Sequence, residues 1–264
     1  MSTPARIRDA LEPIQGVAFR VVESQEDIAT TRLVDDIPEQ VRLEELLEAT
    51  KPRRVPGTEH LHYLLATPFR YPPLLHGSRF GRYFERSLFY GGMTINTALA
   101  ETAYYRFVFL NHLAEPFPKP LRTQHTVFGA RVRTDQGIRL QDQAWDSLHK
   151  ELTHPADYST SQALGSTMRE SGVVAFQFLS ARAQQAGLYS LPYPGDQGLE
   201  GVNIALFEPS ALKDRTPNKA MRLIIVTSRD TVSMSLMRDN GDREVSEFSR
   251  TSFLVDGIFP TPAA

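Results

Sequence analysis

The chain has 264 residues, 41% of them hydrophobic and 23% charged, with 29 basic and 31 acidic side chains. That composition is ordinary for a globular protein and excludes a disordered or fibrous chain. The near balance of charge, a formal −2 at pH 7, excludes a global basic field for nucleic acid or an anionic membrane.

Cysteine is absent from the sequence, which excludes disulfides, thiolate nucleophiles and zinc sites built on cysteine. The N-terminal stretch carries charges at Arg6, Arg8 and Asp9 and lacks the apolar segment of a secretory signal. No apolar run approaches the roughly 18 residues that cross a bilayer. We therefore expect a cytoplasmic protein without direct membrane or nucleic-acid contact.

Residues 20–51 show a helical pattern. Pro38 suits a first helical turn, and apolar residues follow it at near-helical spacing. Residues 51–57 (KPRRVPG) form a proline-interrupted linker. These features divide the chain into an N-terminal helical extension packed on the core, residues 1–59, and a main domain, residues 60–264.

The main domain begins with an apolar segment, residues 60–67, that suits a strand or a buried stretch. In residues 68–92, prolines and glycines exclude a long helix. Guanidinium groups match phosphate and carboxylate, and aromatic rings stack on bases or nicotinamide-like rings. Either the arginines and aromatic residues of this segment form a recognition site, or the arginines are solvated and the aromatic rings pack against the rest of the protein. The residues concerned are Phe69, Arg70, Tyr71, Arg79, Phe80, Arg82, Tyr83, Phe84, Arg86 and Tyr90.

Residues 94–113 give the clearest helix pattern, with Asn96 or Thr97 as the cap. Glu101 lies in the first turns of this helix, among alanine, threonine and apolar residues. Beyond it, strands are expected over residues 127–132 and 138–140 with a turn at 135–137, and over 173–178, 202–207, 222–227 and 231–237. A helix is expected over 159–170 and a long loop over 187–201. The expected fold class is α+β, with a mixed or antiparallel sheet core and flanking helices.

Two further chemical features stay ambiguous. His60 and His62 could place two imidazoles on one strand face, but no third metal ligand is spaced nearby. Ser180 directly follows a buried strand, where a serine is either a ligand contact or a helix cap. The sequence contains no nucleophile elbow, Walker loop or dinucleotide glycine fingerprint.

The order of several short motifs resembles the RES domain, which is named for a scattered arginine, glutamate and serine. Arg79, Tyr90 and Glu101 follow one another at intervals of 11 residues. The motifs are residues 77–81 (GSRFG), Tyr90, residues 97–101 (TALAE), 171–172 (SG), 178–182 (FLSAR) and 201–207 (GVNIALF). The resemblance spans about residues 60–210, which makes residues 60–264 a RES-type catalytic domain.

This resemblance implies a bacterial toxin with a fold similar to that of the ADP-ribosyltransferase toxins. Such a toxin cleaves the nicotinamide–ribose bond of NAD+ by hydrolysis or phosphorolysis, or transfers ADP-ribose to a protein. NAD+ is then a substrate, and neither a metal nor a cofactor is required. The implied partner is an Xre-type helix-turn-helix antitoxin, and a homodimer is left open.

The resemblance also implies residue roles, with Glu101 holding the ribose 2′-hydroxyl and opposing positive charge on the ribose. Arg79 and Arg70 would bind the pyrophosphate, and Tyr90 would clamp the nicotinamide end. The implied catalytic residues are Glu101, Arg79 and Tyr90, and the implied substrate-binding residues are Arg70, Tyr71 and Ser180.

This chain departs from the smaller members of the family at its N-terminal region and at residues 78–81 (SRFG), where Gly-Arg-Trp-Asn is commoner. The alternative to an enzyme is a RES-like module that has lost catalysis and only holds a helix-turn-helix partner.

Overall fold

The computed structural model describes residues 3–24, 37–115, 117, 119–194, 198–238 and 240–260. Within them, the strands are β1 (Glu12–Glu23), β2 (Phe89–Gly92), β3 (Leu121–Arg139), β4 (Ala175–Leu179), β5 (Val202–Leu206), β6 (Asn218–Thr227), β7 (Thr231–Met237) and β8 (Arg243–Ser249). The helices are α1 (Thr3–Asp9), α2 (Ile37–Thr50), α3 (Tyr63–Arg70), α4 (Ile95–Asn111), α5 (Asp146–Leu152), α6 (Ser159–Glu170) and α7 (Ala181–Gln185).

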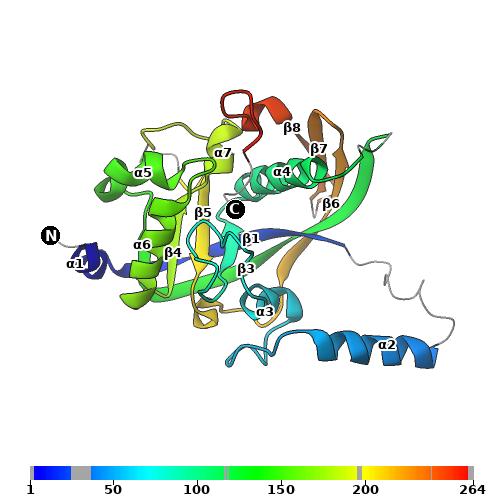
Figure 1. Cartoon of the computed structure of the whole chain (residues 1–264), viewed down its shortest axis with the longest axis horizontal. Coiled ribbons are helices and arrows are strands. Elements are labelled where there is room, and N and C mark those ends of the chain that lie inside the picture. Colours follow the sequence, from blue (N-terminus) through cyan, green and yellow to red (C-terminus); the bar gives the residue numbers. More distant parts are fainter. Residues whose placement is uncertain are drawn as a thin grey trace.

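The strands form a mixed sheet in the order β1-β2-β5-β4-β3-β6-β7-β8, and β1 also pairs with β3 (Figure 1). Only the β3–β4 pairing is parallel among the described strands. Because β1 joins both β2 and β3, the first five strands pair in a closed circuit. The predicted α+β class with a mixed sheet and flanking helices is confirmed, whereas the likeness to ADP-ribosyltransferase toxins stays a prediction.

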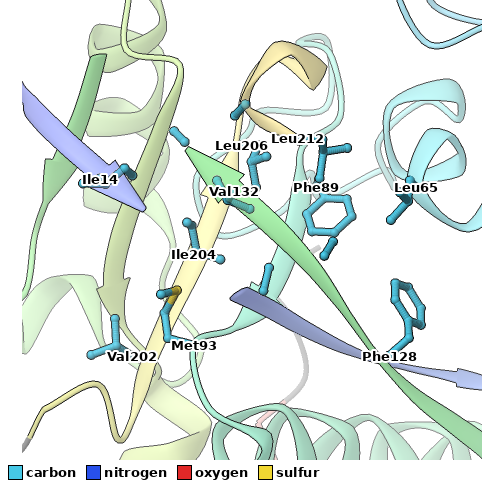
Figure 2. Packing of buried hydrophobic residues seen from close by; sticks show 14 of the residues in the cluster. Ile14, Leu65, Phe89, Met93, Phe128, Val132, Val202, Ile204, Leu206 and Leu212 are labelled. Carbon is cyan, nitrogen blue, oxygen red and sulfur yellow. The ribbon is translucent and has the colours of Figure 1, made fainter. Parts of the chain in front are cut away.

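The main apolar core lies among these five strands. Figure 2 shows Ile14, Phe89, Val132, Ile204 and Leu206 gathered from β1, β2, β3 and β5. Side chains of alternate strand residues reach this core, as the period of two in a strand requires. Each large apolar side chain buried in this way contributes about 1.5–3 kcal/mol.

Two helical layers cover the outside of the sheet. α4 packs through Leu99 and Phe107 against a cluster that includes Leu223 of β6 and Met234 of β7. On the other side, α6 packs through Met168 against β4 (Figure 1). No helix among the described residues is long and apolar enough to cross a membrane.

The prediction that residues 1–59 form a helical extension is wrong for residues 12–23, which are strand β1. This strand pairs with β3 from Glu12↔Gly137 to Glu23↔His125, so β1 belongs to the sheet and not to an appendage. Long-range pairing has overridden the local pattern. The helical pattern holds for α2, and residues 25–36 lie outside the described residues. The boundary at residue 59 stays a prediction.

Two local features of the main domain differ from the sequence patterns. Of the strand or buried stretch expected over residues 60–67, the buried stretch is confirmed by Leu61, Leu65 and Ala66. The strand is not formed, because His62 caps α3 by accepting a hydrogen bond from the Leu64 N–H. The expected turn at residues 135–137 is absent, since pairing with β1 and β4 keeps β3 extended through Gly137. The expected helix at 159–170 is confirmed as α6.

Candidate functional site

A cavity of about 880 Å³ lies between α4, β1, β2 and the loop that precedes β2. Each wall contributes a polar side chain: Arg20 from β1, Arg79 from the loop, Tyr90 from β2, Glu101 from α4 and Asn203 from β5. The cavity therefore brings together residues that are far apart in the sequence, including the three predicted to be catalytic.

One carboxylate oxygen of Glu101 is hydrogen-bonded and the other is free. Its Oε1 accepts hydrogen bonds from the Ser180 hydroxyl and the Asn203 amide, each at 2.7 Å. Its Oε2 has no hydrogen-bond partner among the described residues. The helix itself is fixed at its N-terminus, where the Thr94 side chain accepts from the Thr97 N–H, so Thr94 is the cap and not Asn96 or Thr97. This arrangement leaves one carboxylate oxygen for a ligand.

Ser180 is fully buried and lies behind Glu101, outside the cavity wall. Its hydroxyl oxygen accepts from the Ala183 N–H at 2.9 Å and so caps α7, while the hydroxyl proton goes to Glu101. Of the two interpretations drawn from the sequence, the helix cap is therefore confirmed. The contact that Ser180 makes in the site is with the carboxylate.

Asn203 is a site residue that the sequence reasoning did not single out. It is 6% exposed, and its Oδ1 is buried without a hydrogen-bond partner. A buried polar atom without a partner is costly, and a ligand that donates a hydrogen bond removes the cost. A signal was present, because an asparagine inside the apolar run of β5 needs a polar partner.

Tyr90 fixes the loop that carries Arg79. The Tyr90 hydroxyl accepts from the Phe80 N–H at 3.1 Å and shares a hydrogen bond with the Ser78 hydroxyl at 2.9 Å. Burial raises the pKa of Tyr90 to about 12, so the phenol stays protonated at neutral pH. Its hydroxyl therefore anchors the loop, and its ring lines the cavity.

Arg79 is oriented by main-chain acceptors. One terminal nitrogen, Nη1, donates to the carbonyls of Leu152 at 2.9 Å and His154 at 3.0 Å. The guanidinium lies 4.4 Å from the centre of the Tyr158 ring. Its Nε and Nη2 have no hydrogen-bond partner in the described part of the chain, so they are free to donate to an anion.

The structure separates the predicted pair Arg70 and Tyr71. Tyr71 lines the cavity, but Arg70 does not. The Arg70 guanidinium forms an ion pair with Glu48 of α2 at 2.8 Å and donates to the Pro52 carbonyl at 2.5 Å. Hydrogen bonds from Lys51 and Arg70 hold the pKa of Glu48 down to about 2. Arg70 thus tethers α2, and we drop it from the candidate substrate-binding residues.

Arg20 is a second site residue that the sequence reasoning missed. Its guanidinium lies 4.8 Å from the centre of the Phe89 ring, and its Nη1 is buried without a hydrogen-bond partner. Burial lowers the pKa of Arg20 to about 10, which still leaves it charged at pH 7. An arginine in the apolar stretch GVAFRVV was the available signal, hidden because this region was assigned to a helix.

Of the two histidines considered as metal ligands, His62 has another role. The His62 ring nitrogen Nδ1 is occupied by the cap of α3. Across the described ranges, no group of three or more histidine, cysteine, aspartate or glutamate side chains is placed to hold a metal ion.

Comparison with known proteins gave a family match and a distant likeness to a solved structure. The family model described as RES domain matches residues 51–226, more than half of the chain. No curated protein matches the chain. Among solved structures, the chain is similar to one in the crystal structure of the M. tuberculosis MbcT–MbcA toxin–antitoxin complex, at 11% identity and a TM-score of 0.44. That similarity covers 87% of this chain and 94% of the other.

Proposed function

The chain belongs to the RES-domain family, and on this basis we propose that it is an enzyme that cleaves the nicotinamide–ribose bond of NAD+. We propose further that it acts as the toxin of a toxin–antitoxin pair. Neither a metal nor a cofactor enters the proposed reaction.

The proposed reaction develops positive charge on the ribose. As the C–N bond breaks, its electron pair leaves with nicotinamide, which departs as a neutral molecule and needs no general acid. The ribose is left with oxocarbenium character, and a carboxylate facing that charge lowers the barrier. Water, phosphate or a protein side chain then forms the new bond to the ribose carbon.

The observation that supports this proposal is the geometry of Glu101. Ser180 and Asn203 fix its Oε1, and Oε2 is left free at the cavity wall. Fixing a charge before the reaction avoids reorganisation during it, which is the main source of electrostatic catalysis. The unpartnered Asn203 Oδ1 is an acceptor for a ribose hydroxyl beside the same carboxylate.

Cations around this carboxylate suit the phosphates of the substrate. Arg79 and Arg20 both line the cavity, and each has guanidinium nitrogen atoms without a hydrogen-bond partner in the described residues. Guanidinium groups bind phosphate oxygens through charge-assisted hydrogen bonds. We assign these two arginines to the pyrophosphate.

The proposal is tested by incubating the purified protein with NAD+, with and without phosphate, and identifying the products. Free nicotinamide with ADP-ribose indicates hydrolysis, and a phosphorylated ADP-ribose indicates phosphorolysis. Nicotinamide release that depends on an added protein indicates transfer. Intact NAD+ under all three conditions would contradict an NAD+-cleaving enzyme.

The proposed antitoxin has an apolar surface to bind. The rim of the cavity between residues 71 and 84, which we call the rim loop, exposes Tyr71, Leu74, Leu75, Tyr83 and Phe84 by 40–95%. Contiguous exposed apolar side chains mark protein interaction sites. We propose that an Xre-type antitoxin covers this loop.

Arg79→Ala should raise KM for NAD+ at least as much as it lowers kcat. Arg79 is assigned to a pyrophosphate that is charged in the ground state and the transition state alike. Loss of Arg79 therefore weakens the binding of both states equally. Steady-state kinetics of nicotinamide release measure both constants. Unchanged KM and kcat would mean that Arg79 serves only its two carbonyl partners.

Arg70→Ala provides the matched control, since this arginine lies outside the cavity. We expect KM for NAD+ to stay unchanged. Hydrogen exchange of α2 should become faster, because the variant loses the ion pair with Glu48. A rise in KM equal to that of Arg79→Ala would show that Arg70 belongs to the binding site.

A further inference from the structure

One face of α4 lines the cavity far beyond Glu101. The residues on this face are Ala98, Glu101, Thr102, Tyr105, Arg106 and Phe109. With a rise of 1.5 Å per residue, Arg106 lies about 7.5 Å and Phe109 about 12 Å along the helix axis from Glu101. The helix therefore presents a carboxylate, a cation and an aromatic ring in that order along one cavity.

Arg106 is a cation with unused hydrogen-bonding capacity. Its Nε donates to the Thr227 hydroxyl at 3.0 Å, but its Nη2 is buried without a partner. Burial lowers the pKa of Arg106, and the nearby Glu23 carboxylate opposes that shift. No ion pair joins Arg106 to Glu23 or to another carboxylate among the described residues. Glu23 also lines the cavity, where it is exposed to solvent.

Phe109 supplies a flat surface at the far end. Its side chain is 43% exposed, and the Arg106 guanidinium lies 5.3 Å from the centre of its ring. Purine bases stack both on aromatic faces and on guanidinium planes. An exposed ring next to an arginine with an unpartnered nitrogen is suited to a nucleotide, which combines a base with a phosphate.

We infer that this end of the cavity is the adenosine-phosphate subsite, in which Arg106 binds a phosphate and Phe109 stacks on the adenine. This inference rests on the proposed function and adds the direction in which the dinucleotide lies. The nicotinamide riboside is at Glu101, the phosphate on the adenosine side follows at Arg106, and the adenine reaches Phe109. The order along α4 matches the order of the groups along NAD+.

A series of shortened substrates tests this order. NAD+ contains all the groups, nicotinamide mononucleotide lacks the adenosine and the phosphate attached to it, and nicotinamide riboside lacks both phosphates. We would measure kcat/KM for nicotinamide release with Phe109→Ser and Arg106→Met. The matched controls are Tyr63→Ser, an exposed ring outside the cavity, and Arg222→Met, an exposed arginine outside it.

Phe109→Ser should lower kcat/KM for NAD+ by roughly five- to a hundredfold and leave the two smaller substrates unchanged. Arg106→Met should lower it by roughly ten- to a hundredfold for NAD+ but not for the mononucleotide or the riboside, because both lack the phosphate attached to adenosine. The control variants should behave as the parent. If the smaller substrates react too slowly to measure, the affinity for AMP decides, and it should fall in both variants only.

Equal effects of Phe109→Ser on all three substrates, or an AMP affinity that neither variant changes, would overturn the subsite. Failure of the parent to release nicotinamide from any substrate would instead overturn the proposed function, and the subsite with it. The two failures are therefore distinguishable in one experiment.

Discussion

Glu101→Gln should abolish NAD+ cleavage while the protein stays folded. The amide keeps the shape of the side chain but removes the negative charge that opposes the oxocarbenium. Loss of one such electrostatic group typically lowers the rate on the order of 10²–10³-fold. The Ser180 and Asn203 donors still find the amide oxygen, so the local structure is retained. Nicotinamide release at saturating NAD+ measures the effect.

A thermal melt and a control substitution complete this test. Glu170→Gln removes an exposed carboxylate at the end of α6 and should leave the rate unchanged. If Glu101→Gln melts at the parent temperature and still cleaves NAD+ at the parent rate, Glu101 is not the catalytic carboxylate.

Expression of the chain alone in bacteria should arrest growth and deplete cellular NAD+, because an enzyme that consumes NAD+ kills the cell that makes it. Co-expression of the antitoxin should restore growth. The Glu101→Gln variant, expressed at the same soluble level, should be harmless and provides the control. Normal growth with undiminished NAD+ would exclude the toxin and leave a binding module that only holds a partner.

The proposed antitoxin should act by occupying the place of NAD+. A segment inserted beside the rim loop, with a carboxylate near Arg79, would mimic the pyrophosphate. Its binding should then compete with NAD+ and should weaken as salt rises, because charge pairing contributes to it.

The site was partly predictable from sequence because three of its residues stand in recognisable motifs. Arg79, Tyr90 and Glu101 could be placed by their spacing, and the structure brings all three to one cavity. Arg70 could not be excluded, since only the tertiary contact with Glu48 removes it from the cavity. Arg20 was missed because the strands beside it, β2 and β3, lie far along the chain, beyond any local pattern.

The fold was predictable where local signals agreed with the final structure. Helix α4 has both the apolar face and the capping residues of a helix, and β4 and β5 are continuous apolar runs. The unbroken course of β3 was not predictable. Residues 135–137 are Asp-Gln-Gly, a good turn sequence, and only pairing with β1 and β4 keeps them extended.

During synthesis on the ribosome, β1, which carries Arg20, is made long before β3, the strand with which it pairs. Arg20 lies opposite Phe128 of β3. At a synthesis rate of about 5–20 residues per second, the partner strand follows roughly 5–20 s after β1. Asn203 of β5, which also lines the cavity, is made later still. A chain still on the ribosome therefore has no complete cavity, and the proposed activity can begin only after most of the chain has been made.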